Sequence, residues 1–323
     1  MRLRLVPQDT KWDFFKTSTS TLTFGLSLLA MVASIVLFFT MGLNYGIDFK
    51  GGTTIRTDSA VAVDVSAYRD AITPLGLGDV SITEVFDLTK PDLHVTQIRI
   101  EAQDGDESVT SATIVKIKNA LQAYEPSIVF AAVESVGPKV SGELIQTAIW
   151  AVVLAIAAVL FYIWLRFEWQ FSVGAVAALV HDVVLTIGIF SLVQIKFDLA
   201  IIAALLTIVG YSLNDTVVVF DRVRENLRKF KQMSLKDVLN GSINETLSRT
   251  VMTSVTTLIA LIALFVLGGD VIRGFVFAMI WGVIVGTYSS VFVASAILLR
   301  FGVKRDWSKK DPSTGGQYTN IDA

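Results

Sequence analysis

The sequence predicts a polytopic α-helical membrane protein with six spanning helices and one small α+β domain between the first two of them. Of its 323 residues, 53% are hydrophobic and 17% are charged, and the mean hydropathy is +0.60. Soluble domains carry about 25% charged residues, so this composition favours a membrane protein. Six stretches are apolar over roughly 20 residues, the length that a helix needs to cross a bilayer.

The first apolar stretch follows several basic residues, as the core of a signal peptide does. Its apolar run is about twice as long as that of a signal peptide, and no A-x-A-like cleavage site follows Leu43. We therefore interpret it as an uncleaved anchor that spans the membrane. The six predicted spans are 22–43, 144–165, 171–193, 199–220, 250–268 and 274–299.

Basic residues gather on one side of these spans. The short loops of the other side hold only Lys196 and Arg273. Loops rich in lysine and arginine stay in the cytoplasm, so the pattern predicts that both termini are cytoplasmic. The basic segments are 1–20, 166–170, 221–249 and 300–323, with four, one, seven and five lysines or arginines.

The long outer segment between the first two spans has the pattern of a small α+β domain. Its order, βαββαβ, predicts a ferredoxin-like fold. The predicted elements are strand 53–57, helix 63–75, strands 79–87 and 93–101, helix 108–124 and strand 127–135. The chain thus divides into a cytoplasmic N-terminus (1–21), a first span (22–43), the outer domain (44–142), a five-helix bundle (143–299) and a cytoplasmic tail (300–323).

One inner connector of the bundle, 221–249, is longer than the others and has the spacing of an amphipathic helix. Two interpretations stay open for it. It lies along the bilayer surface with its basic residues at headgroup level, or it is a soluble connector. The apolar residues in question are Val223, Leu227, Phe230, Leu235, Val238 and Leu239.

Ionisable residues inside the spans are costly, by about 2.5 to 3.5 kcal/mol each on insertion scales, so they indicate function. Asp215 lies in the fourth span beside Asn214, and Arg249 opens the fifth span. Buried in an apolar segment, Asp215 can take up and release a proton, with Arg249 as its positive partner in the ionised state.

A hydroxylated stripe follows Arg249 along the fifth helix. Thr253 and Thr257 recur at a spacing of four residues, which places them on one face. Together with Asn214 they could bind water and carry a proton. The alternative is a static polar cluster that holds the helices together.

The third span contains His181 and Asp182. Because neighbouring residues on a helix point about 100° apart, the two side chains are not expected to face each other. A packing role and a role in proton access both stay open for His181 and Asp182. In the sixth span, Ala278, Gly282, Gly286 and Ser290 form a stripe of small residues that predicts close helix packing.

The sequence lacks the residues that several kinds of functional site require. The sequence has no cysteine, which excludes disulfides and thiolate metal sites. The glycine-containing segments GGTTIRT (51–57) and GLGD (76–79) lack the Gly-Lys-Ser/Thr ending of a phosphate-binding loop. We therefore expect that the protein is not an enzyme and binds no cofactor. The energy for any conformational change must come from an ion gradient or from a partner.

Four motifs resemble the SecD/SecF family of protein-export membrane proteins, in the resistance-nodulation-division superfamily. They are GIDFKGGT (46–53), ESVGPKVSGEL (134–144), GYSLNDTVVVFDRVREN (210–226) and NETLSRTVMTSVTTL (244–258). They occur in the family's order, and the similarity extends to about Lys304.

The resemblance implies six spans that form half of a repeat pair, with SecD as the other half. It implies a periplasmic outer domain, location in the bacterial inner membrane, and the proton gradient as energy source. Asp215 matches the family's proton-binding carboxylate, and Arg249 its basic residue near the fifth span. The implied partners are SecD, the SecYEG channel, SecA, YajC, YidC, a translocating preprotein and membrane lipid; no nucleic acid is expected.

Two other functions stay open. A small-molecule exporter of the same superfamily normally has two repeats and larger outer domains than this chain. A passive assembly scaffold would use Asp215 only to hold helices together. Asp with Asn and Thr neighbours could also bind Na⁺ in place of H⁺.

Overall fold

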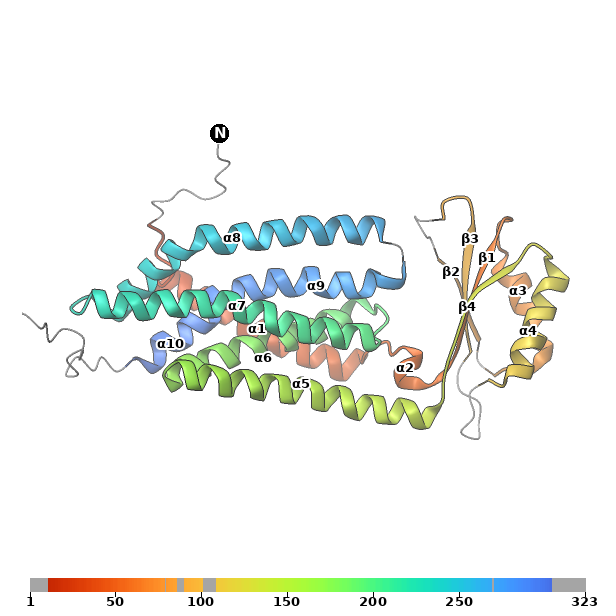
Figure 1. Ribbon diagram of the computed structural model, residues 1–323, viewed down its shortest axis with the longest axis horizontal. Coiled ribbons are helices and arrows are strands. Elements are labelled where there is room, and N and C mark those ends of the chain that lie inside the picture. Colours follow the sequence, from red (N-terminus) through yellow and green to blue (C-terminus); the bar gives the residue numbers. More distant parts are fainter. Residues whose placement is uncertain (1–10, 79, 86–89, 101–108, 269, 304–323) are drawn as a thin grey trace, which may run out of the picture.

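Long helices form a bundle, and a sheet domain caps one end of it (Figure 1). The computed structural model describes residues 11–78, 80–85, 90–100, 109–268 and 270–303. The basic residues Arg2 and Arg4, and the predicted tail beyond 303, lie outside the described residues. So do the outermost residues of some predicted strands and of the second predicted helix.

Within the described part of the chain, six helices are long and apolar enough to cross a membrane, which confirms the predicted number. Gly42, with φ of 66°, ends the first of them. Asp198 and Ser234 cap the N-termini of the fourth and fifth by accepting backbone N–H bonds. The helices are α1 (Thr17–Met41), α5 (Pro138–Arg166), α6 (Trp169–Val193), α7 (Leu199–Lys229), α8 (Leu235–Leu267) and α9 (Asp270–Ser289), which continues through the π-helix η2 (Ser290–Ala294) into α10 (Ser295–Phe301).

The sheet domain has the predicted βαββαβ order. Its four strands lie in the order β2-β3-β1-β4 with every neighbouring pair antiparallel, which is the ferredoxin-like arrangement. Helices α3 and α4 cover the face away from the bundle (Figure 1). The elements are β1 (Gly52–Ser59), α3 (Val65–Ile72), the 3₁₀ turn η1 (Thr73–Leu75), β2 (Val80–Val85), β3 (His94–Ile100), α4 (Ser111–Tyr124) and β4 (Val129–Val136).

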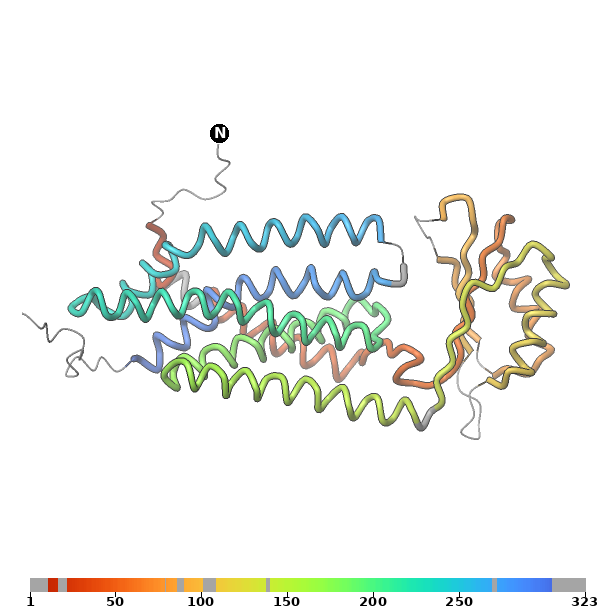
Figure 2. The backbone as a smooth tube through the Cα atoms, in the orientation of Figure 1, coloured from red at the N-terminus to blue at the C-terminus, as the bar shows by residue number. Residues whose placement is uncertain are grey.

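The chain enters and leaves the sheet domain by different routes, as the trace in Figure 2 shows. It enters through the short helix α2 (Ile47–Lys50) and leaves from β4 directly into α5. The entering segment pairs with the loop between α6 and α7. Gly46 N–H donates to the Phe197 carbonyl (2.7 Å), and Phe197 N–H donates to the Asn44 carbonyl (2.7 Å).

The connector 221–249 is not a separate surface helix. Its first part is the end of α7 and its last part is the start of α8, with a turn between them. Val223, Leu227, Val238 and Leu239 are buried in one apolar core with the bundle. The lipid-surface interpretation is therefore wrong: the amphipathic spacing is satisfied because the two helices pack on each other and on the bundle.

The small-residue stripe of the last span packs against α7. A Cβ atom on Gly282 would stand 2.3 Å from Cγ1 of Ile208, and one on Gly286 would stand 3.0 Å from Cβ of Ser212. Both glycines therefore let the two helices approach closely, which confirms the predicted packing role.

Gly282→Ala is expected to destabilise the bundle by about 1–3 kcal/mol, because the new methyl group overlaps a β-branched side chain with little rotamer freedom. Thermal unfolding in detergent measures the effect. Gly210→Ala in α7 is the matched control: its Cβ would meet nothing within 4 Å. That change should be neutral or slightly stabilising. Equal unfolding temperatures for the two variants would contradict the packing argument.

A short N-terminal segment crosses the start of α8 before α1 begins. The side chain of Asn244 accepts a bond from Trp12 N–H (3.0 Å) and donates to the Trp12 carbonyl (2.9 Å). One helical turn earlier, Asn240 accepts from Phe14 N–H (2.9 Å) and donates to the Asp13 carboxylate (2.8 Å). We call these contacts the N-terminal clasp.

Asn244→Ala is expected to lower the free energy of unfolding by about 3 kcal/mol, because the two bonds to Trp12 and the bond to the Asn240 carbonyl (2.8 Å), of about 1 kcal/mol each, are lost. Asn119→Ala, an exposed asparagine of α4, serves as the control and should change nothing. Thermal unfolding compares the two variants with the parent chain. A shift no larger than that of the control would mean that the clasp does not stabilise the fold.

Candidate functional site

Asp182 is the centre of a buried polar cluster in the middle of the bundle. Its side chain is 1% exposed. Its Oδ2 atom accepts bonds from Ser212 Oγ of α7 (2.6 Å) and Ser289 Oγ of α9 (2.8 Å), and Oδ1 lies 3.0 Å from His181 Nδ1. A carboxylate with three partners from three helices is well satisfied and ties those helices together.

The close contact between His181 and Asp182 corrects the expectation that they do not face each other. The 100° rotation describes where the Cα–Cβ bonds point, and the atoms beyond Cβ span that angle, so that His181 Nδ1 and Asp182 Oδ1 lie 3.0 Å apart. The His181 ring also stacks on Tyr288, with 6.2 Å between centroids. Tyr288 Oη donates to the Thr23 carbonyl (2.8 Å) and lies 3.0 Å from Ser27 Oγ, so the cluster reaches α1.

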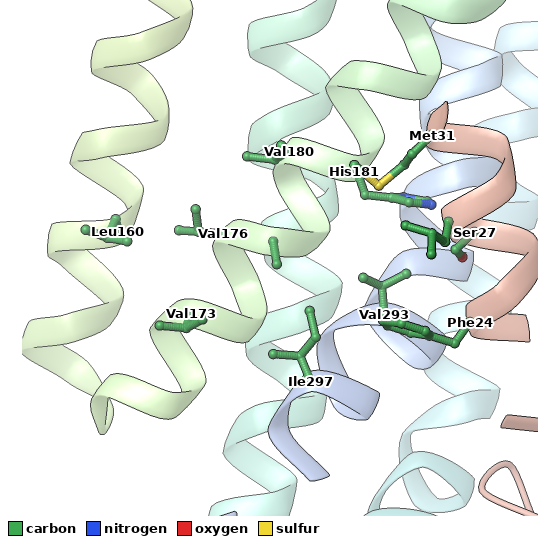
Figure 3. Close-up of a pocket in the computed structure, with 12 residues that line it drawn as sticks. Phe24, Ser27, Met31, Leu160, Val173, Val176, Val180, His181, Val293 and Ile297 are labelled. Carbon is green, nitrogen blue, oxygen red and sulfur yellow. The ribbon is translucent and has the colours of Figure 1, made fainter. Parts of the chain in front are cut away.

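His181 also borders an apolar cavity of about 380 Å³ between α1, α5, α6 and the last helix (Figure 3). Apart from His181, Ser27 is its polar lining residue. Within the described part of the chain, His181 Nε2 has no hydrogen-bond partner. The ring therefore lies between the Asp182 cluster, which holds one nitrogen, and this cavity. The other lining residues are Phe24, Leu28, Met31, Leu160, Val173, Val176, Ala177, Val180, Val293 and Ile297.

Asp215 lies one turn beyond Ser212 on α7 and has a different environment. It is 3% exposed, and its Oδ2 atom has no hydrogen-bond partner among the described residues. A buried carboxylate oxygen without a partner is unfavourable by several kcal/mol in the charged form. The two carboxylates buried in the described part of the bundle thus differ: both oxygens of Asp182 have hydrogen-bond partners, and Asp215 Oδ2 has none.

Arg249 and Asn214 are both exposed, although the sequence groups them with Asp215. Among the described residues, no ion pair within 4 Å joins Asp215 to Arg249. Contact between these two charges would require Arg249, or the start of α8, to move.

The predicted hydroxyl stripe of α8 bonds mainly to its own helix. Thr253 Oγ1 donates to the Thr250 carbonyl (2.9 Å), and Thr257 Oγ1 donates to the Thr253 carbonyl (2.8 Å). The hydroxyl contact between helices is instead Ser254 with Thr287 of α9, at 2.7 Å. The buried Thr250 hydroxyl has no partner in the described part. The role of this stripe in proton transfer stays a prediction.

The sequence analysis did not predict the π-helix η2. It begins immediately after Ser289, which donates a hydrogen bond to Asp182. Its wider turn is visible in the bond from Ser295 Oγ to the Ser290 carbonyl (3.2 Å), five residues back. Single π turns often mark functional sites in helices.

Comparison with known proteins identifies the family. Residues 116–304 match the family described as protein export membrane protein SecD/SecF, C-terminal, and residues 36–58 match the SecD/SecF GG motif. Protein translocase subunit SecF of Cereibacter sphaeroides is 60% identical over 100% of this chain and 99% of its own. The SecF subunit of Rhodobacter capsulatus is 57% identical over 97% of this chain and 95% of its own.

The chain belongs to the SecF family of protein translocase subunits. Family membership places it among the membrane components of Sec protein export, and the six apolar helices make it a multi-pass bacterial membrane protein.

Solved SecDF structures agree with this fold. SecDF of Thermus thermophilus, described as a translocon-associated membrane protein, superposes with a TM-score of 0.80 at 34% identity over 93% of this chain. A super-membrane-facing form of SecDF gives a TM-score of 0.66 at 36% identity. In both cases the SecF-family chain spans 40% of the SecDF chain.

Proposed function

We propose that this chain is the SecF half of a proton-driven SecD–SecF unit that promotes preprotein export across the bacterial inner membrane. The observation that carries the proposal is the buried Asp215 carboxylate, which has an unpartnered oxygen in the described structure. Both termini would be cytoplasmic, with the sheet domain in the periplasm, as the distribution of basic residues predicts.

The environment of Asp215 supports two states. In the protonated state the side chain is neutral and tolerates the apolar surroundings of α7. In the ionised state it needs a positive partner, and Arg249 is the residue in reach of a local movement of α8. Binding and release of one proton would thereby alternate two arrangements of α7 and α8.

Helix α7 offers a rigid path from this carboxylate to the sheet domain. Leu199 N–H, at its first turn, donates to the Asp48 carboxylate (3.0 Å), and Asp48 belongs to α2 at the domain entrance. Sixteen residues, or about 24 Å of helix, separate Leu199 from Asp215. A shift of α7 would therefore move the base of the sheet domain, which would grip or release a translocating chain.

The energy available is sufficient for such a shift. One charge that crosses 100 mV releases about 2.3 kcal/mol. That energy changes a two-state equilibrium roughly fortyfold.

SecD is the proposed partner, since this chain spans 40% of the SecDF chain on which it superposes. Action with SecYEG and SecA, and contacts with YajC and YidC, belong to the same proposal. Asp182, Asn214, Thr253 and Thr257 are proposed to line the proton path with Asp215 and Arg249.

The test uses inverted inner-membrane vesicles depleted of this chain and then supplied with it. Export of a secreted reporter is followed with the proton gradient imposed or collapsed, and with Na⁺ present or replaced by K⁺. The proposal expects gradient-dependent acceleration only when the chain is present, and no requirement for Na⁺. Acceleration that needs Na⁺ would mean that Na⁺, and not H⁺, is the coupling ion. Equal export rates with and without the chain would refute the proposed role in preprotein export.

A further inference from the structure

Helix α5 ends at the end of the bundle away from the sheet domain (Figure 1). A charged groove lies there, between the end of α5 and the last turns of α7. Its volume is about 760 Å³. Four basic and two acidic side chains line it, which leaves a net charge of +2. The lining residues are Arg166, Asp221, Arg224, Glu225, Arg228 and Lys229.

Two arginines of this groove contact the same aromatic ring. The guanidinium groups of Arg166 and Arg224 lie 5.2 Å and 5.8 Å from the centroid of the same ring, that of Phe167. Arg224 Nη1 also donates to the Arg166 carbonyl (3.2 Å). Both positive groups are thereby fixed at the groove, where they would attract a bound anion.

The acidic residues of the groove already have partners. Asp221 lies 3.5 Å from Arg166, and Glu225 lies 2.9 Å from Arg222, which is outside the groove lining. Arg228 and Lys229 form no ion pair within the part of the chain that the structure describes, and both are exposed. The groove therefore keeps positive charge that its own carboxylates do not neutralise.

Exposed aromatic residues place this groove at headgroup level. Trp164 is 57% exposed and Trp169 is 51% exposed, on either side of Arg166. Tryptophan concentrates at the boundary between lipid tails and headgroups. Phe161 and Leu165, which are also exposed, continue the apolar surface of α5 from there toward the bilayer centre.

We infer that this groove binds the phosphate of an anionic phospholipid, whose acyl chains lie along the exposed face of α5. Arginine forks match phosphate oxygens in a bidentate manner, and basic pockets between spanning helices suit anionic headgroups. The site is separate from Asp215, so its existence does not depend on proton coupling.

Native mass spectrometry of the purified full chain in detergent tests the inference, with phosphatidylglycerol and phosphatidylcholine added in equal amounts. Arg228→Gln removes one groove charge. Lys231→Gln removes one charge at the same end of the bundle, outside the groove lining, and is the matched control. Thermal unfolding of both variants verifies that they remain folded.

The parent chain is expected to retain phosphatidylglycerol in preference to phosphatidylcholine. Arg228→Gln should weaken that retention about fivefold, or about 1 kcal/mol, while Lys231→Gln leaves it unchanged. Equal losses of phosphatidylglycerol retention in the two variants would mean that the lipid is attracted by the overall charge of this end of the bundle. That result would contradict a specific site in the groove. Displacement of the lipid by millimolar inorganic phosphate would show an ion site without lipid specificity, and would also overturn it.

Discussion

The Asp215→Asn variant is expected to lose all acceleration of export by the proton gradient while its fold remains intact. Asparagine has nearly the same volume as aspartate, but its amide neither binds nor releases a proton near neutral pH. It mimics the protonated side chain, so α7 would stay in one of its two arrangements. Because the buried Asp215 Oδ2 has no partner in the described structure, its replacement removes no hydrogen bond there.

Export of the reporter from inverted vesicles at matched expression measures this effect. The parent chain should respond to the imposed gradient, and Asp215→Asn should show only the rate seen with the gradient collapsed. Asp70→Asn, at an exposed carboxylate of the sheet domain, controls for the loss of one negative charge. If Asp215→Asn responds like the parent, the carboxylate only holds helices together and the scaffold function gains support.

Asp182→Ala, unlike Asp215→Asn, is expected to destabilise the fold strongly. The substitution leaves the Ser212 hydroxyl and His181 Nδ1 without their acceptor, whereas Ser289 Oγ keeps its bond to the Gly286 carbonyl (3.2 Å). Each unsatisfied buried group costs about 1–3 kcal/mol, so the free energy of unfolding should fall by roughly 3 kcal/mol or more. Asp182→Asn keeps an acceptor oxygen and should lose less.

Thermal unfolding in detergent compares these variants, and the serines provide an internal control. The triple variant Asp182→Ala with Ser212→Ala and Ser289→Ala removes the two serine hydroxyls together with the carboxylate that accepts their hydrogen bonds. It should be no less stable than Asp182→Ala alone, because the three groups act as one unit. Additive losses would instead mean that each serine stabilises the bundle independently of Asp182.

Much of the architecture could be predicted from the sequence because it depends on local patterns. Each span needs about 20 apolar residues, whatever its neighbours are, so hydropathy alone located the six helices. The βαββαβ order of the sheet domain follows from alternation and helical spacing, and the observed strand order agrees with it. The stripe around Gly282 and Gly286 also predicted its own packing role, since small residues allow close contact with many partners.

The sequence by itself determined that the chain crosses the membrane six times and carries a few polar groups at membrane depth. Only the tertiary structure decided which of those groups meet. Asp182 and Asp215 are alike in sequence, each a single carboxylate in an apolar helix, yet one has three partners and the other has an unpartnered oxygen. Hydropathy depends on each residue's own chemistry, whereas two of the three Asp182 partners, Ser212 and Ser289, are 30 and 107 residues away in the chain.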